Sequence, residues 1–212
     1  MNKIYLIRHA ESVANTLGIY QGQTCDTDLS PLGVKQAKAL AIKLKSEEFD
    51  KVYCSPLKRT LLTAQAIAGF HDRRIDVITD RNIVETNHGK WEGLRKKEIE
   101  FRWPRLYRLW HIDPENVKFP AGERFARTAQ RAVSWFTKIS AEKGKIAVVT
   151  HANIIQAILV HVRGHELNSM WEISVDPAAV NIVETHSPAR ITVLNETGHL
   201  AGIRADLSIH AI

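Results

Sequence analysis

Ile146-Ala147-Val148-Val149-Thr150-His151 is the stretch of sequence that decides the fold. Its apolar run is too short for a helix and too apolar for a loop, so it predicts a buried strand. An apolar segment with helical character follows it through Val162. A buried strand that leads directly into a helix is typical of a parallel sheet with helices packed on it.

The same alternation of short apolar runs and helical segments repeats along the chain. Further strands are predicted at residues 4–7, 51–54, 75–79, 179–184 and 190–194. Ser30-Pro31 and Ser55-Pro56 each predict a helix start, because serine caps the first turn and proline is tolerated there. A longer helix is predicted around residues 121–143 from its apolar face. We therefore expect an α/β fold, a three-layer sandwich with a mostly parallel central sheet flanked by helices.

Length and charge limit the organisation of the chain. Residues 1–212 are predicted to form a single domain. The stretch around residues 80–120 breaks the alternation, and we expect it to be a lid-like insertion over the sheet. Most of the net charge of +6 lies near it, since Lys90–Arg131 holds eleven Lys and Arg against six Asp and Glu. Such a cluster attracts anions, whether nucleic acid, a membrane surface or a small phosphorylated metabolite.

Composition argues against several classes of protein. Hydrophobic residues make up 44% of the chain and charged residues 25%, as in an ordinary globular domain. No apolar run approaches the roughly 20 residues of a membrane span, and the N-terminal run is too short for a signal peptide. Cys25 and Cys54 lack the spacing of a metal site or a disulfide framework. We therefore expect a cytoplasmic protein with no membrane partner.

Three predicted strands deliver cationic side chains to one edge of the sheet. Arg8-His9 follows the first strand, Arg59 follows the second, and His151 follows the strand that ends at Thr150. Ligands of open α/β sheets bind beyond the carboxyl ends of the strands. An arginine can grip two phosphoryl oxygens at once, and a neutral histidine can attack phosphorus. The convergence of these residues therefore predicts phosphoryl transfer.

Phosphoryl transfer also needs an acid that protonates the leaving alkoxide, and Glu85 is the candidate. It lies just past the third predicted strand, before two glycines that permit a tight turn. A bound phosphate dianion would raise its pKa and neighbouring arginines would lower it, and we expect the phosphate to dominate. Glu92 is the local rival, but its position between Trp91 and Gly93 indicates that it stabilises the turn.

Several motifs follow one another along the chain between Lys3 and Glu184. They are Arg8-His9-Ala10-Glu11-Ser12, Leu29-Ser30-Pro31-Leu32-Gly33, Ser55-Pro56-Leu57-Lys58-Arg59-Thr60, Glu85 with Gly89-Lys90-Trp91-Glu92-Gly93, Pro120-Ala121-Gly122-Glu123 and Val149-Thr150-His151. In this order they resemble the histidine phosphatase superfamily, the phosphoglycerate mutase-like proteins. The resemblance implies a phosphoglycerate mutase-like fold.

The resemblance also implies a role for each matched residue. His9 would be the nucleophile that becomes phosphohistidine, and Glu85 would be the proton donor. The phosphoryl oxygens would be held by Arg8, Arg59 and His151, with Asn15 assisting. The substrate would also contact the residues beside these, Gln21, Gly22, Ala152 and Asn153. The family needs no metal or other cofactor, and because dimers are common in it, a homodimer is expected.

The same site can serve two reactions. If water takes the phosphoryl group from His9, the enzyme is a metal-independent phosphatase that hydrolyses a small anionic phosphorylated metabolite. If the product takes it back, the enzyme is a 2,3-bisphosphoglycerate-dependent phosphoglycerate mutase. Mutases of this family typically carry an arginine directly after the acidic glutamate, whereas Thr86 follows Glu85 here. The phosphatase is therefore favoured.

The basic insertion indicates a second anionic group on the substrate, with Arg95 and Arg108 as contacts. Phosphoglycerate, phosphoserine, a sugar phosphate and a nucleotide-loop phosphate such as alpha-ribazole phosphate stay open. Trp103, Tyr107 and Trp110 recur at helical spacing and are more typical of core than of pocket lining.

Two other classes of protein are weaker alternatives. A nucleic-acid-binding protein would explain the basic charge, but the sequence shows no recognised nucleic-acid module, so no nucleic-acid partner is expected. His161 and His165 have a spacing that could coordinate a metal in a hydrolase. No carboxylate lies between them and Arg163 would repel a cation, so no metal site is expected.

Overall fold

The computed structural model of the protein describes residues 2–210. Within them, six strands form one sheet in the order β3-β2-β4-β1-β5-β6. The strands are β1 (Lys3–Arg8), β2 (Lys51–Cys54), β3 (Val77–Thr79), β4 (Lys145–Thr150), β5 (Val180–Glu184) and β6 (Arg190–Glu196). The first four strands pair in parallel, whereas β5 runs antiparallel to both β1 and β6. The predicted, mostly parallel sheet is confirmed.

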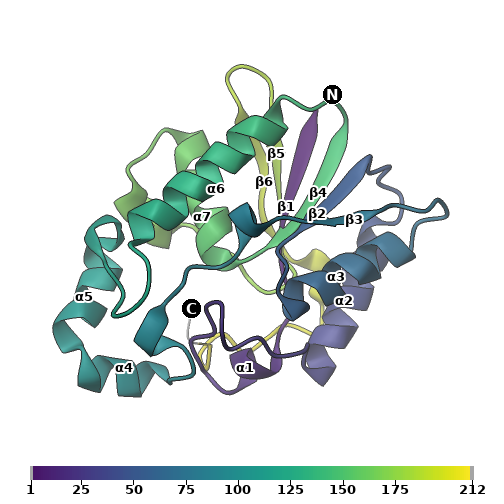
Figure 1. Ribbon diagram of the computed structural model, residues 1–212. Helices are drawn as coiled ribbons and strands as arrows, with labels where there is room; N and C mark the ends of the chain where they lie inside the picture. The colour runs from purple at the N-terminus through teal and green to yellow at the C-terminus, as the bar shows by residue number, and fades with distance from the viewer. Residues whose placement is uncertain (1, 211–212) are drawn as a thin grey trace.

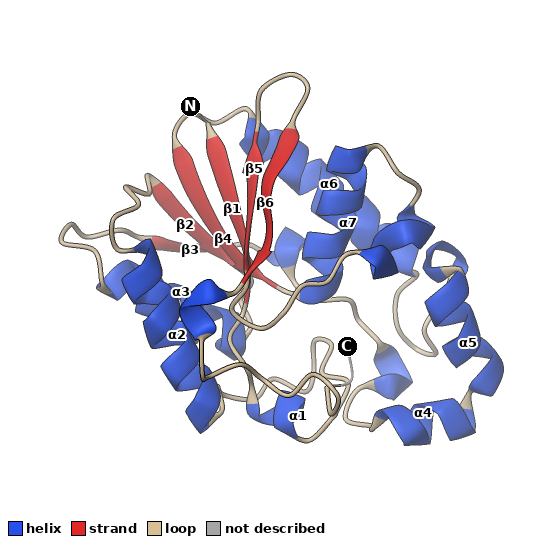
Figure 2. Cartoon of the chain, turned by 180° about the vertical axis from the view of Figure 1, so that it is seen from behind, coloured by secondary structure: helices blue, strands red, loops and turns tan. Residues whose placement is uncertain are grey.

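Helices cover both faces of the sheet, because side chains of each central strand alternate between two apolar layers. Ile4 and Leu6 of β1 pack into the core that contains α6 (Phe125–Ser140) and α7 (Ala152–Arg163). Tyr5 and Ile7 pack into the core on the opposite face. That core contains α2 (Pro31–Leu44) and α3 (Lys58–Gly69). Figures 1 and 2 show the resulting three layers, as the sequence predicts.

The remaining α-helices of residues 2–210 are α1 (Val13–Thr16), α4 (Lys96–Arg102) and α5 (Pro104–Ile112). Figures 1 and 2 show all three at the end of the molecule where β1 and β4 finish. Tyr107 and Trp110 are buried in the core, and Trp103 packs against it, so the interpretation of these aromatic residues as core is confirmed. No helix among residues 2–210 is both long enough and apolar enough to span a bilayer.

Of the two predicted helix starts, the one at Ser30 is confirmed and the one at Ser55 is wrong. Ser30 caps α2 as predicted, because its Oγ accepts a hydrogen bond from the Gly33 amide at 2.9 Å. Ser55 does not cap α3, which begins at Lys58 after Leu57. The Ser55 hydroxyl instead lies 2.8 Å from Nε2 of His151. Its Oγ also accepts a long hydrogen bond, 3.4 Å, from the amide of Leu57, which precedes the helix, so Ser55 supports the turn before α3 and not its first turn.

Candidate active site

A cavity lies at the carboxyl edge of the sheet, with about 310 Å³ of empty space that includes its opening to solvent. Its lining residues are Arg8, His9, Asn15, Ile19, Gln21, Gly22, Arg59, Glu85 and Ala152. His151 lies against it, because its ring is edge to face with that of His9 at a centroid distance of 5.3 Å. The structure thus brings together all five residues for which the sequence predicts catalytic roles.

His9 is the first residue beyond β1 and is held by its neighbour strand. Its amide donates to the carbonyl of Thr150 in β4 at 2.9 Å. Its Nδ1 lies 2.7 Å from the carbonyl oxygen of Ala10, and a carbonyl only accepts, so Nδ1 carries the proton and Nε2 the lone pair. Burial, together with the charges of Arg59 and Arg8, holds the pKa of His9 well below its ordinary value. The ring is therefore neutral at pH 7 and keeps the lone pair that a nucleophile needs.

The two guanidiniums are buried, and protein carbonyls fix their orientation. Arg8 Nη1 donates to the carbonyl of Val175 at 2.6 Å, and Arg59 Nη2 donates to that of Gly22 at 2.9 Å. Arg59 also lies 3.4 Å from a carboxylate oxygen of Asp26. Burial lowers the pKa of both, that of Arg8 to about 10. Two cations removed from water beside each other are compensated best by a multiply charged anion such as a phosphoryl group.

His151 immediately precedes α7, whose first residue, Ala152, lines the cavity. The N-terminus of this 12-residue helix adds a dipole that favours an anion. Burial, with the charge of Arg59, lowers the pKa of His151 well below its ordinary value. Asn153 is completely buried and does not line the cavity. Its Nδ2 donates to Thr86 Oγ1 at 3.2 Å instead.

Glu85 is the carboxyl group of the cavity. It is buried, and its Oε1 accepts a hydrogen bond from the Thr86 amide at 2.8 Å. Burial raises the pKa of Glu85, although the Thr86 amide and the charge of Arg59 oppose the shift. From the sequence, only a bound phosphate is expected to raise the pKa of Glu85. In the structure, desolvation already raises this pKa before any substrate binds.

A helical turn and the loop after it hold the remaining polar residues of the lining, Asn15 and Gln21. Ser12 and Asn15 form a capping box at the start of α1, and the Ser12 hydroxyl also donates to Gln21 Oε1 at 2.8 Å. Beyond Gln21, Gly22 has a φ of +52°, and a Cβ there would lie 2.0 Å from Oε1 of Glu92. Glycine at this position therefore lets the cavity loop approach the Glu92 carboxylate.

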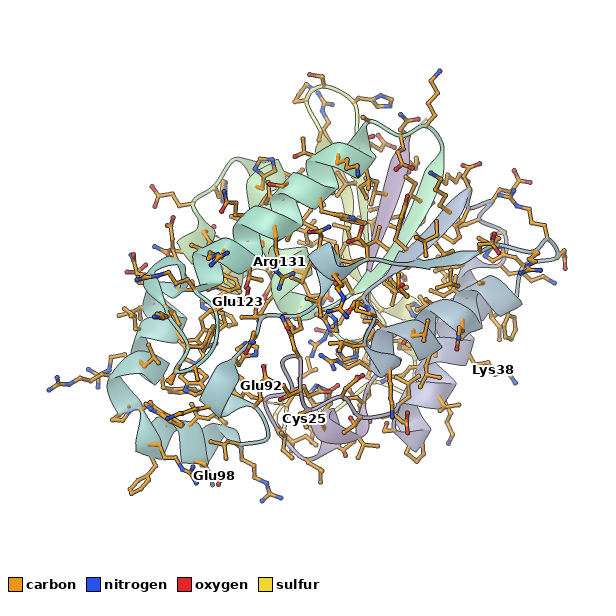
Figure 3. The ribbon with its side chains drawn as sticks, in the orientation of Figure 1. Cys25, Lys38, Glu92, Glu98, Glu123 and Arg131 are labelled. Carbon is orange, nitrogen blue, oxygen red and sulfur yellow. The ribbon has the colours of Figure 1, made fainter. Side chains whose placement is uncertain are left out.

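The Glu92 carboxylate accepts from three backbone amides, those of His88 at 2.8 Å, Gln23 at 3.1 Å and Thr24 at 2.7 Å. Figure 3 shows Glu92 close to Cys25, the residue that follows this loop segment. The interpretation of Glu92 as a turn-stabilising residue is confirmed.

Arg95 and Arg108 are exposed and are not among the residues that line the cavity. Sequence reasoning in turn missed Gln23 and the partnership of Ser55 with His151. Ser55 lies within a motif, so its polarity was a usable signal. Gln23 donates through its side chain to a backbone carbonyl, that of Glu85, and nothing in its type or spacing marks such a contact.

Metal-binding geometry is not found in the described part of the chain. Among residues 2–210, no three His, Cys, Asp or Glu side chains are placed to hold a metal ion together. His161 is exposed in the last turn of α7, and His165 is exposed just beyond that helix.

Fold and cavity together define a phosphoryl-transfer enzyme of the α/β class, whose site combines two arginines, two histidines and one carboxyl group. The sequence model of the histidine phosphatase superfamily (branch 1) matches residues 4–197, and the chain belongs to this superfamily. The predicted family is thereby confirmed.

The chain is similar to several phosphatases over nearly its whole length. Phosphoserine phosphatase 1 of Hydrogenobacter thermophilus is 36% identical over 203 residues, which cover 94% of this chain and 95% of that protein. Adenosylcobalamin/alpha-ribazole phosphatase of Escherichia coli is 28% identical, covering 91% and 95%. A mutant phosphoserine phosphatase of Entamoeba histolytica, solved in complex with phosphoserine, has a TM-score of 0.83 at 28% identity, covering 94% and 100%. The predicted enzyme class, a phosphatase, and the phosphoglycerate mutase-like fold are confirmed.

Proposed function

We propose that the protein hydrolyses phosphoserine, or a phosphomonoester of closely similar size and charge, through a phosphohistidine at His9. The observation that carries this proposal is the hydrogen bond between Nδ1 of His9 and the Ala10 carbonyl, 2.7 Å long. It leaves Nε2 with a lone pair inside the cavity that Arg8, Arg59 and Glu85 also line.

The reaction runs in two balanced steps. Nε2 of His9 attacks phosphorus, an N–P bond forms, and the P–O bond to the alcohol breaks while the Glu85 carboxyl gives its proton to the departing oxygen. Water then attacks the phosphorus, the N–P bond breaks, and the Glu85 carboxylate takes a proton from that water. The guanidiniums of Arg8 and Arg59 neutralise the phosphoryl oxygens in both steps, and the ring of His151 donates a hydrogen bond to them.

The surroundings of the cavity support a small substrate that carries an ammonium group. A second hollow of about 580 Å³ shares Arg8 and Ala152 with the first, and Asp176, Ser174 and Trp171 are among its lining residues. Asp176 is the acidic residue of this lining and suits a substrate ammonium rather than a second anion. The relatives named phosphoserine phosphatase, and the related structure with phosphoserine bound, support the same substrate.

The test compares phosphoserine with 3-phosphoglycerate, which has a hydroxyl in place of the ammonium, in assays without added metal. We expect phosphoserine to have the higher kcat/KM, and Asp176→Asn to lower this preference about tenfold by weakening one charge interaction. His9→Ala is the control without turnover. Equal rates for both esters in the wild type and in Asp176→Asn would overturn the substrate assignment.

Four finer predictions belong to the same proposal. Two unpaired thiols, Cys25 and Cys54, support a reducing, cytoplasmic compartment. We also propose that the enzyme works as a homodimer, that the insertion around residues 80–120 acts as a lid, and that neither nucleic acid nor a membrane is a partner. Compartment fractionation tests the location, and sedimentation tests the homodimer. Limited proteolysis with and without vanadate tests the lid. Gel-shift and vesicle-binding assays at moderate salt test for nucleic-acid and membrane binding.

A further inference from the structure

Arg131 of α6 binds the backbone of the segment that carries Glu85. Its Nη1 donates to the carbonyls of Asn82 at 2.9 Å and Val84 at 2.6 Å. Its Nη2 donates to the carbonyl of Glu85 itself at 3.0 Å. A single guanidinium thus satisfies three carbonyls within four consecutive residues, because its planar fork presents several donors in fixed directions.

Glu123 completes this arrangement. Its Oε1 lies 3.1 Å from Nη2 of Arg131 and accepts a hydrogen bond from the Asn87 amide at 2.7 Å. Both side chains are about four-fifths buried, and Figure 3 shows them side by side. The pair therefore holds the backbone on both sides of Glu85.

The segment around Glu85 needs such support because regular secondary structure does not stabilise its backbone. Residues 84–88 belong to no helix or strand, so no ladder of backbone hydrogen bonds fixes them. Gln23, next to the cavity-lining Gly22 in the sequence, donates through Nε2 to the same Glu85 carbonyl at 2.7 Å. The Glu85 backbone is thus held between Gln23 of the cavity loop and Arg131 of α6.

We propose that Arg131, oriented by Glu123, is a positioning residue that aims the carboxyl of Glu85 at the leaving oxygen of the substrate. This inference rests on the proposed function, in which Glu85 is the general acid. A general acid must lie within hydrogen-bond reach of the atom that it protonates, and a misplacement of about 1 Å costs about 100-fold in rate. Loss of the three carbonyl contacts would permit a shift of that size.

The effect of the Arg131 charge on the pKa of Glu85 distinguishes a positioning role of Arg131 from a purely electrostatic one. The charge of Arg131 lowers the pKa of Glu85, as do those of Arg59 and Arg8, against the larger effect of burial. Removing Arg131 would therefore keep Glu85 protonated to higher pH. A loss of activity at neutral pH in an Arg131 variant then reports a displaced acid, not an ionised one.

The test compares kcat/KM for phenyl phosphate and 2,4-dinitrophenyl phosphate in Arg131→Gln, Arg131→Lys and Glu123→Gln. Dinitrophenolate leaves without a proton, whereas phenolate departure needs the acid, and kcat/KM reports only the steps up to loss of the leaving group. We expect Arg131→Gln to lose about 10- to 100-fold with phenyl phosphate and less than about 3-fold with the dinitrophenyl ester. Arg131→Lys, which keeps the charge but not the fork, should show the same pattern more weakly.

Two reference variants make the outcomes distinct. Arg127→Gln removes an exposed arginine one turn earlier on α6 and should leave both substrates unaffected. Glu85→Gln must itself lose far more with phenyl phosphate than with the dinitrophenyl ester. If it does and the Arg131 and Glu123 variants lose equally on both esters, or lose nothing, the positioning role is overturned. If Glu85→Gln loses equally on both, the acid assignment fails, and this inference fails with it.

Discussion

The rings of His9 and His151 meet edge to face at 5.3 Å, although the two residues come from opposite halves of the chain. The parallel pairing of β1 with β4, in which Arg8 is opposite Thr150, places the residues that follow each strand side by side. Burial and the nearby arginines lower the pKa of both rings. A pair of neutral imidazoles beside fixed cations is therefore the resting state of the site.

The pH profile of kcat/KM should follow the shifted groups. Because the pKa of His9 is lowered, protonation of this ring should not reduce activity around pH 6.5. Because burial raises the pKa of Glu85, the fall in activity on the alkaline side should begin above the ordinary range of a carboxyl group, as the acid loses its proton. Steady-state rates between pH 4 and 9, corrected for substrate ionisation, check this. An alkaline limb that persists unchanged in Glu85→Gln would contradict it.

Buried His88 should make the fold acid-sensitive. Its ring packs against Tyr20 and Phe119, and burial lowers its pKa to about 3. Between that value and the ordinary pKa of about 6.5, the unfolded chain binds a proton that the folded chain does not, so stability falls as pH falls. His88→Phe should reduce the pH dependence of the unfolding free energy between pH 6 and 4 by about 1.4 kcal/mol per pH unit.

Urea unfolding at several pH values measures this slope. The exposed His165, replaced by phenylalanine, is the matched control, and its slope should stay that of the wild type. An identical slope in His88→Phe and the wild type would show that the ring already titrates in the folded protein.

The sheet could be predicted from the sequence because each central strand is an apolar run bounded by polar residues. Strand direction could not, because β5 has the same apolar pattern as its parallel neighbours but pairs antiparallel with β1. Helix α6 starts at Phe125 and not at Ala121, because Ala121 has a φ of +55° and Gly122 lies against the backbone at Asn87. Such contacts between distant segments leave no periodic signal.

The residues of the site that sit at or just after strand ends could be predicted from the strand pattern: Arg8 ends β1, and His9 and His151 follow β1 and β4 directly. The supports of Glu85 could not, because Gln23 and Arg131 act on its backbone carbonyl, and any residue type offers the same carbonyl. The contacts Arg95 and Arg108 are predicted from charge alone, and charge does not indicate whether an exposed side chain faces the cavity.

Replacing Arg59 by lysine should lower kcat/KM strongly, although the substitution keeps the positive charge. Arg59 Nη2 is held by the Gly22 carbonyl and Nη1 lies near Asp26, so the fork has a fixed orientation toward the cavity. An ammonium cannot grip two phosphoryl oxygens, and we expect kcat/KM to fall about 100-fold, as for the loss of one charge-assisted contact in the transition state. Arg102→Lys, at an exposed position of α4, is the control. A loss below threefold at Arg59 would rule out a bidentate contact.

Truncating Glu92 should loosen the loop that lines the cavity. Glu92→Ala leaves the amides of His88, Gln23 and Thr24 without their acceptor, and we expect the unfolding free energy to fall by about 1–2 kcal/mol. KM should rise more than kcat falls, because Gly22 in this loop lines the cavity while Glu92 itself does not. Glu100→Ala removes an exposed carboxylate of α4 for comparison. Equal stability and equal KM in the two variants would contradict the role of Glu92.

The central claim is that His9 carries the phosphoryl group during turnover, and rapid quenching with a ³²P-labelled phosphomonoester tests it most directly. The account predicts a stoichiometric label on the polypeptide that is labile in acid and stable in alkali, maps to the peptide that contains His9, and is absent from His9→Ala. A wild-type enzyme that turns over while its quenched protein carries no label, or carries it on a hydroxyl such as that of Ser55, would contradict it.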